Sequence, residues 1–144
     1  MTVRSILAQK GSSVVTVRSD TQVREAVRRL KQANVGALVV SDDGATVAGI
    51  ISERDIVRAL GDHDTGLLDM PVSRLMTREV RTCRPEDRIK ELMGVMTHGR
   101  FRHLPVVEDG EMIGLVSIGD IVKCRVDELE HETNHLREYI VGSR

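Results

Sequence analysis

The sequence has few aromatic residues and no surplus of either charge. Its 144 residues include one Phe, one Tyr and no Trp, whereas proteins that bind single-stranded nucleic acid stack bases on aromatic side chains. The 21 Lys and Arg residues are balanced by 22 Asp and Glu residues, whereas a dedicated DNA-binding domain carries a basic excess. We therefore expect no nucleic acid among the partners of this protein.

Long apolar runs and paired cysteines are also missing. No apolar run approaches the ~18 residues of a membrane span, and residues 1–11 lack the apolar region of a signal peptide. Cys83 and Cys124 form neither a CxxC pair nor a disulfide framework, which fits a reducing compartment. Because 40% of the residues are hydrophobic, the chain can bury a sizeable core. These features predict a soluble, cytoplasmic α/β protein without a membrane span.

An internal repeat runs through most of the chain. The segment VGALVVSDDG at 35–44 returns as FRHLPVVEDG at 101–110, and VAGIISERDIVR at 47–58 returns as MIGLVSIGDIVK at 112–123. The distances between the copies, 66 and 65 residues, differ by one residue within the turns, where a change of length costs little. Such self-similarity indicates two copies of one structural unit.

The hydrophobic pattern of each copy predicts the order strand, helix, strand, turn, strand, helix. The expected first strands are 14–17 and 80–83, the helices 23–30 and 89–96, and the hairpins 37–40 with 47–51 and 104–107 with 112–116. Asp43-Gly44 and Asp109-Gly110 suit the hairpin turns, Ser52 and Ser117 suit the starts of the closing helices, and a short helix at 5–10 precedes Gly11. One unit of about 50 residues cannot bury its sheet alone, so we expect the two to pack together.

The repeated motifs resemble those of a known family. Gly49-Ile50-Ile51-Ser52-x-x-Asp55 and Gly114-Leu115-Val116-Ser117-x-x-Asp120, the second preceded by Leu104-Pro105-Val106, resemble a tandem pair of CBS domains, a Bateman module, over about residues 14–123. The resemblance implies an α/β fold of two βαββα repeats packed face to face with pseudo-two-fold symmetry. We expect a lead-in at 1–13, repeats at 14–60 and 77–125, a linker at 61–76 that is exposed up to Pro71, and a long C-terminal helix at 126–144.

The same resemblance implies a regulatory role without catalysis. CBS pairs sense adenosyl ligands (AMP, ADP, ATP, S-adenosylmethionine or NAD(H)), for example in energy sensing, and regulate a fused or partner protein. We expect a stand-alone module that binds an adenine nucleotide and signals to an unidentified protein through a conformational or dimer shift. The alternative is a ligand-independent dimeric interaction scaffold.

The Ser and Asp of each motif suit a nucleotide site. They are three residues apart at an expected helix start, so they share one face of the first turn. Free backbone N–H groups attract an anion there, the Ser hydroxyl can reach a phosphate, and the Asp carboxylate can accept both ribose hydroxyls. The alternative is that Ser52 and Ser117 only cap their helices.

The resemblance further implies that each site takes Ser and Asp from one repeat, and the first strand with basic residues from the other. The site at Ser117 and Asp120 then includes Arg102 and Arg54, and its adenine lies near Val14, Val15 and Thr16. Two guanidiniums bind a phosphate strongly, so we expect this site to be the primary one. The alternative for the two arginines is a surface ion pair with a carboxylate.

The second site, at Ser52 and Asp55, is poorer in phosphate ligands. Gly36 and Gly119 stand where the first site has its two arginines. Its remaining basic candidate is His103, and its adenine wall is expected at Val80 and Arg81.

Two patterns overlap in the expected C-terminal helix. An apolar seam recurs at spacings of four and three and predicts a homodimer, unless the helix folds back on its own domain; it consists of Val122, Val126, Leu129, Thr133, Leu136 and Ile140.

The same helix contains a segment, His131-Glu132-Thr133-Asn134-His135, that matches the H-E-x-x-H signature of zinc proteases. A catalytic zinc needs three protein ligands in a walled cleft, and only Glu138 follows as a third candidate. A zinc hydrolase is therefore the less favoured alternative, and we expect neither enzymatic activity nor a bound metal.

Overall fold

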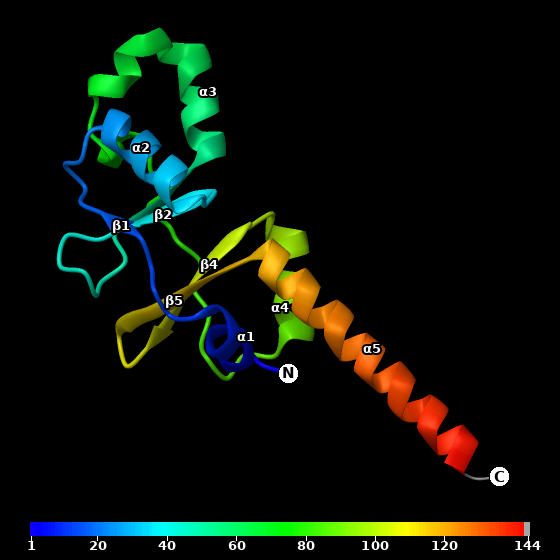
Figure 1. Cartoon of the computed structure of the whole chain (residues 1–144). Coiled ribbons are helices and arrows are strands. Elements are labelled where there is room, and N and C mark those ends of the chain that lie inside the picture. The colour runs from blue at the N-terminus through cyan, green and yellow to red at the C-terminus, as the bar shows by residue number, and fades with distance from the viewer. Residues whose placement is uncertain (143–144) are drawn as a thin grey trace.

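The protein folds into two α/β repeats and a long C-terminal helix that projects away from them (Figure 1). This computed structural model describes residues 1–142, so positions 143 and 144 of the expected C-terminal helix lie outside the described residues. The first repeat contains β1 (Thr16–Val17), α2 (Val23–Ala33), β2 (Ala37–Val40), β3 (Gly49–Ser52) and α3 (Glu53–His63). The second contains α4 (Ile89–Gly99), β4 (His103–Glu108), β5 (Glu111–Ser117) and the start of α5 (Ile118–Gly142). The α/β class, the two repeats and the C-terminal helix are thus confirmed.

The sheet of the first repeat has the order β1-β2-β3. Strand β1 runs parallel to β2, and β2 runs antiparallel to β3. All four residues of the central strand β2 are buried, as expected for an apolar strand with a neighbour on each side. Strand β1 is shorter than the sequence predicts, because only Thr16 and Val17 pair with β2, while Val14 and Val15 precede the strand.

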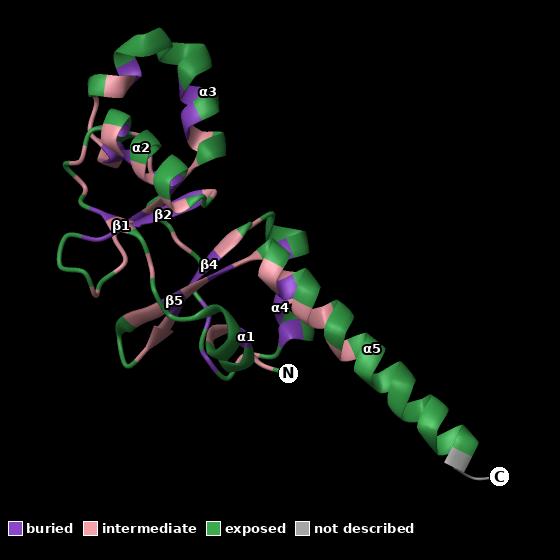
Figure 2. Ribbon diagram, viewed as in Figure 1, coloured by how far each residue is buried: buried purple, intermediate pink, exposed green. Residues whose placement is uncertain are grey.

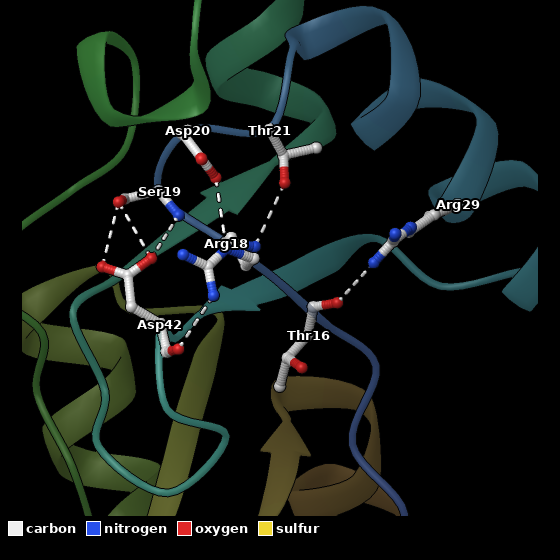
Figure 3. Close-up of polar contacts among 7 residues, drawn as sticks. All are labelled: Thr16, Arg18, Ser19, Asp20, Thr21, Arg29 and Asp42. Carbon is white, nitrogen blue, oxygen red and sulfur yellow. Dashed lines mark hydrogen bonds and ion pairs between the residues drawn. The ribbon is translucent and has the colours of Figure 1, made fainter.

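Side-chain hydrogen bonds hold β1 and the turn that follows it (Figure 3). Arg29 on α2 donates from Nη1 to the carbonyl oxygen of Thr16 at 2.9 Å. Ser19 donates from its backbone N and its Oγ to the carboxylate of Asp42 at 2.8 and 2.9 Å, and these bonds lower the pKa of Asp42 below its usual value. The short strand is therefore fixed by groups on α2 and on the loop after β2.

The second repeat has a two-stranded sheet, β4-β5, and the expected strand at 80–83 is wrong. Within residues 1–142, Cys83 alone of that segment bridges to β4: it donates from N to the carbonyl oxygen of Pro105 and accepts from the N–H of Val107, both at 2.9 Å. Extending this parallel ladder upstream requires a donor at position 105 for the carbonyl of Arg81, and proline has no N–H. The first repeat has Val39 at the equivalent position, and there the strand pairs.

The two hairpins turn differently. In the second, Asp109 (φ 53°) and Gly110 (φ 80°) adopt the left-handed conformations that a two-residue turn of this kind needs, as predicted. In the first, only Gly44 (φ 80°) has a positive φ. The loop is held instead by the Asp43 carboxylate, which accepts hydrogen bonds from the N–H groups of Ala45 and Thr46 at 2.8 and 2.7 Å; these bonds lower its pKa.

Helix α1 (Val3–Lys10) packs on the second repeat, although it precedes the first in the chain (Figure 1). Val3 donates from N to the carbonyl oxygen of Asp87 at 3.0 Å. The side chains of Val3 and Ile6 are buried in the second hydrophobic core, together with Ile89, Leu92, Met96, Leu104, Val106, Val116 and Ile121. The lead-in is therefore a structural part of the second repeat.

The linker is folded back onto the first repeat, which corrects the expectation of an exposed loop. Residues 61–66 are exposed, but α3 extends to His63 and two 3₁₀ helices follow, η1 (Asp64–Asp69) and η2 (Val72–Arg74). Leu67 and Val72 are fully buried in the first core, because apolar side chains recur through this segment. Thr77 closes the contact, since its backbone N and O exchange hydrogen bonds with Ile50 at 2.9 and 3.0 Å.

Within residues 1–142, helix α5 packs on the second repeat and α1 through its first half. Ile121 is buried in the second core, whereas residues 129–141 are all exposed (Figure 2). No helix among residues 1–142 is long and apolar enough to cross a membrane.

A glycine-to-alanine pair tests the packing of the linker on β3. An added Cβ at Gly49 would lie 2.7 Å from Sδ of Met76 and 2.8 Å from the backbone oxygen of Thr77, whereas one at Gly94 on α4 meets nothing within 4 Å. We expect Gly49→Ala to lower the free energy of unfolding by about 1–3 kcal/mol through overpacking, and Gly94→Ala to raise it by about 0.5–1 kcal/mol through helix propensity. Urea unfolding measures both, and equal effects would contradict the close approach.

Candidate functional site

A cleft of about 440 Å³ lies between the two repeats, within the size range of pockets that hold small molecules. Its walls come from the end of β3 and the start of α3, the segment 77–81, the loop before β4 and the start of α5. The cleft brings together eight of the residues singled out from the sequence: Ser52, Arg54, Asp55, Val80, Arg81, Arg102, His103 and Ser117. Asp120, Val14, Val15 and Thr16 are not among its lining residues.

The start of α3 presents a carboxylate to this cleft. Ser52 caps the helix and accepts a hydrogen bond from the N–H of Asp55 at 3.3 Å, while its own N and Oγ donate to Oδ2 of Asp55 at 2.8 and 3.0 Å. Within the described residues no donor bonds the other oxygen, Oδ1, of Asp55. Capping therefore uses one oxygen of Asp55 and leaves the second for a ligand hydroxyl.

Five arginines line the cleft: Arg54, Arg58, Arg81, Arg100 and Arg102. None of them forms an ion pair with any residue in the range 1–142, so the alternative of surface ion pairs for Arg54 and Arg102 does not describe this structure. The acidic residues in the lining are Glu53, Asp55 and Glu79. Five guanidiniums against three carboxylates give the cleft an excess of positive charge.

Two of these arginines, Arg58 and Arg100, were not singled out from the sequence. Arg58 lies one helical turn after Arg54 on α3, a spacing that places both on one face. Arg100 follows α4 in the left-handed conformation (φ 58°), as Asn34 does (φ 53°) at the equivalent position of the first repeat. The helical spacing predicts that Arg58 lies beside Arg54, whereas no local sequence pattern indicates that Arg100 lines the cleft.

His103 is half-buried at the boundary between the cleft and helix α1. Its ring is close to Gly36, where an added Cβ would lie 3.7 Å from Nε2. Burial lowers the pKa of His103, and the charges of Lys10 and Arg102 lower it further, against the opposing influence of Asp120 and Glu53. The imidazole is therefore neutral near neutral pH.

The motif at Ser117 and Asp120 is occupied by the chain itself. Lys10, at the end of α1, donates from Nζ to Oδ2 of Asp120 at 2.6 Å and to the carbonyl oxygen of Leu115 at 2.8 Å. Beside this pair lies a smaller cavity of about 140 Å³, which Asp120 lines with Ile6, Gln9, Lys10, Lys123, Cys124 and Asp127. Burial raises the pKa of Asp120, but the hydrogen bonds from Lys10 and Ser117 outweigh it, and the net pKa is lowered.

The geometry thus favours the Asp55 motif as the primary site, whereas the sequence analysis expected the Asp120 motif. The Asp55 motif opens into the large cleft with five arginines, while the Asp120 motif holds an ion pair with α1. Lys10 was missed because nothing near it in the sequence indicates that α1 crosses to the second repeat. Thr16 carries no cleft contact and accepts from Arg29 instead.

The H-E-x-x-H segment has no third ligand among the described residues. His131 and His135 lie on the exposed part of α5, and among residues 1–142 no group of three or more His, Cys, Asp or Glu side chains is arranged to hold a metal ion. Nothing around this segment supports the zinc-hydrolase alternative.

The sequence and fold are similar to those of known proteins. The CBS domain family model matches residues 3–62 and 72–127. The mitochondrial CBS domain-containing protein CBSX3 of Arabidopsis thaliana is 38% identical over 149 residues, covering 98% of this chain and 72% of its own length. A CBS-domain-containing protein from Agrobacterium tumefaciens has a solved structure with a TM-score of 0.83 at 44% identity, covering 87% of this chain and 99% of that one.

Two of the similar solved structures contain adenosyl ligands. The CBS domain pair of protein MJ0100, solved in complex with methylthioadenosine and S-adenosyl-L-methionine, has a TM-score of 0.78 at 25% identity. The match covers 89% of this chain and 98% of that one.

The Lys10–Asp120 contact predicts a shift in a single carboxyl titration. Lys10→Met removes the hydrogen bond that lowers the pKa of Asp120, so we expect that pKa to rise, as followed by NMR of the side-chain carboxyl carbon. Because both side chains are partly exposed, the free energy of unfolding should fall by less than about 1 kcal/mol. Lys123→Met is the matched control, since Lys123 lines the same cavity without an ion pair to a described residue. An equal rise in both variants would contradict the assignment.

Proposed function

Because the chain belongs to the CBS domain family, we propose that it is a regulatory, non-catalytic module that binds a phosphate-bearing adenosyl ligand between its two repeats. The ligand class comprises AMP, ADP, ATP and NAD(H). The observation that carries this proposal is the set of five arginines around one cleft that have no ion-pair partner within residues 1–142. Guanidinium groups bind phosphate oxygens through charge-assisted, often bidentate hydrogen bonds.

The charge of the cleft supports phosphate over the ligands of the similar MJ0100 pair. S-adenosylmethionine carries a positive sulfonium group and methylthioadenosine carries no charge, so neither gives the five arginines a phosphate to bind. A nucleotide supplies that anion, and a second or third phosphate engages more guanidiniums than one does. We therefore expect affinity to rise from methylthioadenosine through AMP to ATP.

Within this proposal each residue of the cleft has a role. Oδ1 of Asp55 accepts the ribose hydroxyls, and the positive end of the α3 dipole, with Ser52, faces the phosphates. Val80 and Arg81 flank the adenine, His103 lies beside them, and the guanidiniums of Arg54 and Arg102 take the phosphates from opposite repeats. The ligand then bridges the repeats, which is the requirement for it to change their relative orientation.

The output of the module follows from that bridge. A ligand that contacts both repeats favours one angle between them. A regulated protein that binds this conformation more tightly then responds to the ligand. We propose a homodimer through the seam of α5, a still unidentified regulated protein, and a cytoplasmic location. The location is supported by the two free cysteines, of which burial raises the pKa of Cys83 to about 12 and so keeps its thiol protonated.

One observation favours a ligand-independent scaffold instead. Lys10 already fills the Asp120 motif, as in a site whose binding role has been lost. The two functions differ in their response to ligand, because only a reversible binder is stabilised in proportion to ligand concentration. Melting temperatures with AMP, ATP, NADH and S-adenosylmethionine decide between them, once co-purifying nucleotide has been excluded.

Matched alanine variants test which motif binds. We expect Asp55→Ala to weaken ATP binding by about 1.5–3 kcal/mol, the range for hydrogen bonds to a charged group, and Asp120→Ala to weaken it less. Isothermal titration calorimetry measures both affinities. Each variant loses the hydrogen bond from the backbone N–H of its serine, so the comparison cancels that shared contact. A larger loss of affinity in Asp120→Ala would make the Asp120 motif the primary site, as expected from the sequence.

A second pair of measurements tests the phosphate preference. Arg102→Met should lower the affinity for ATP roughly tenfold, the loss of a charge-assisted hydrogen bond, and leave the weak binding of methylthioadenosine nearly unchanged. Arg24→Met is the control, because Arg24 pairs with Asp69 away from the cleft. A parallel loss for both ligands would place Arg102 at the adenosine rather than at the phosphates.

A further inference from the structure

Helix α5 carries an apolar seam that the two repeats leave exposed. Of its members, Val126, Leu129 and Leu136 are 47, 44 and 61% exposed. The helix packs on the second repeat with another face, to which Ile121, Cys124, Arg125 and Glu128 belong. The seam lies about a quarter to a third of a turn around the helix from that face, at 3.6 residues per turn. It is therefore available to a partner without any change in the fold.

The seam has the seven-residue spacing of a two-stranded coiled coil. In the usual lettering of such a repeat, Val126, Thr133 and Ile140 take the a positions, and Val122, Leu129 and Leu136 take the d positions. β-Branched residues at a with leucine at d favour two strands. Thr133 places no unsatisfied hydroxyl in the seam, because its Oγ1 donates to the carbonyl oxygen of Leu129 at 2.9 Å.

The charges beside the seam define what fits it. Glu132 occupies a g position and Arg137 the e position of the next repeat, five residues later, and neither forms an ion pair with another residue of 1–142. In a parallel, in-register pair of helices, each g residue faces the e residue five positions later in the other helix. Glu132 would face Arg137 of a second copy, twice by symmetry. Arg125 and Glu130 repeat the same complementary pattern one heptad earlier, although Arg125 also pairs with Glu128 of its own helix at 3.0 Å.

An antiparallel pair centred on Thr133 gives ion pairs on one flank at most, whereas the parallel pair gives them on both. There g positions face g positions and e positions face e positions. If Thr133 packs opposite Leu129, Glu132 meets Glu132 and Glu130 meets Glu130, which is repulsive on both flanks. If Thr133 packs opposite Leu136, Glu130 meets Arg137 on one flank, but Glu132 meets Tyr139 on the other, so only one flank carries ion pairs.

We propose that the seam of α5 binds a second copy of this chain as a parallel, in-register coiled coil, held in register by Glu132–Arg137 ion pairs. The inference rests on the homodimer of the proposed function and adds its geometry. It is independent of what the cleft binds.

Charge reversal tests the geometry in the full chain without ligand. Glu132→Arg places a second guanidinium against Arg137 of the other copy, and Arg137→Glu places two glutamates together, so each variant should dimerise about tenfold more weakly. An equimolar mixture of the two should recover the wild-type affinity, because every facing pair is then opposite in charge, and the double variant should recover it as well. Sedimentation equilibrium measures the dimer dissociation constant, and circular dichroism confirms the fold. Glu138→Arg is the matched control, since its charge change equals that of Glu132→Arg but lies on the outward face.

Three results would overturn the proposal. If the wild-type chain stays monomeric, the homodimer of the proposed function is wrong, whereas the proposal of ligand binding in the cleft is unaffected. Weakening by Arg137→Glu alone, without rescue in the mixture, indicates antiparallel helices with Glu130 facing Arg137. A dimer that none of the variants changes is formed by another surface.

Discussion

The hydrophobic core of each repeat is completed by a segment that lies outside it. Val3 and Ile6 of α1 enter the second core, and Leu67 and Val72 of the linker enter the first. The chain therefore crosses between the repeats at its start as well as in its middle, and the two cores are tied together by covalent connections. A ligand that enters the cleft therefore meets side chains of both repeats at once.

The packing of these two segments on the strands explains why Gly49 and Gly114 are glycines. Gly114 faces Leu7 of α1, whose Cδ2 would be 2.6 Å from an added Cβ, and Gly49 faces Met76 at the equivalent position. Each glycine thus lets the completing segment lie directly on its strand. Because the two segments differ in sequence, they leave the two motifs in different states: α1 ends in Lys10, which binds Asp120, whereas the linker continues into Val80 and Arg81 and opens beside Asp55.

Much of the fold could be predicted from local patterns, and the exceptions have physical causes. The Asp109-Gly110 turn and the Ser52 cap follow from conformational preferences of neighbouring residues, and both form. The strand at 80–83 fails because of Pro105, a residue on the opposing strand whose missing N–H matters only once the register is known. The arginines on α3 share a periodicity that the sequence contains, but Arg100 depends on a left-handed residue after α4. Lys10 depends on a contact between residues 110 positions apart, which no local pattern contains.

The cleft and the seam lie on one rigid element. Ser117 and Ile118 line the cleft where α5 begins, and the helix continues without a break to Gly142, a length of about 37 Å at 1.5 Å per residue. Ile121 fixes that helix to the second core, so its far end moves with the second repeat. In the proposed dimer the two coiled helices hold the second repeats together as a stem. A ligand that changes the inter-repeat angle then rotates the first repeats relative to that stem, because they are the parts that the seam does not hold. Within this proposal the regulated protein therefore recognises the position of the first repeat relative to the stem.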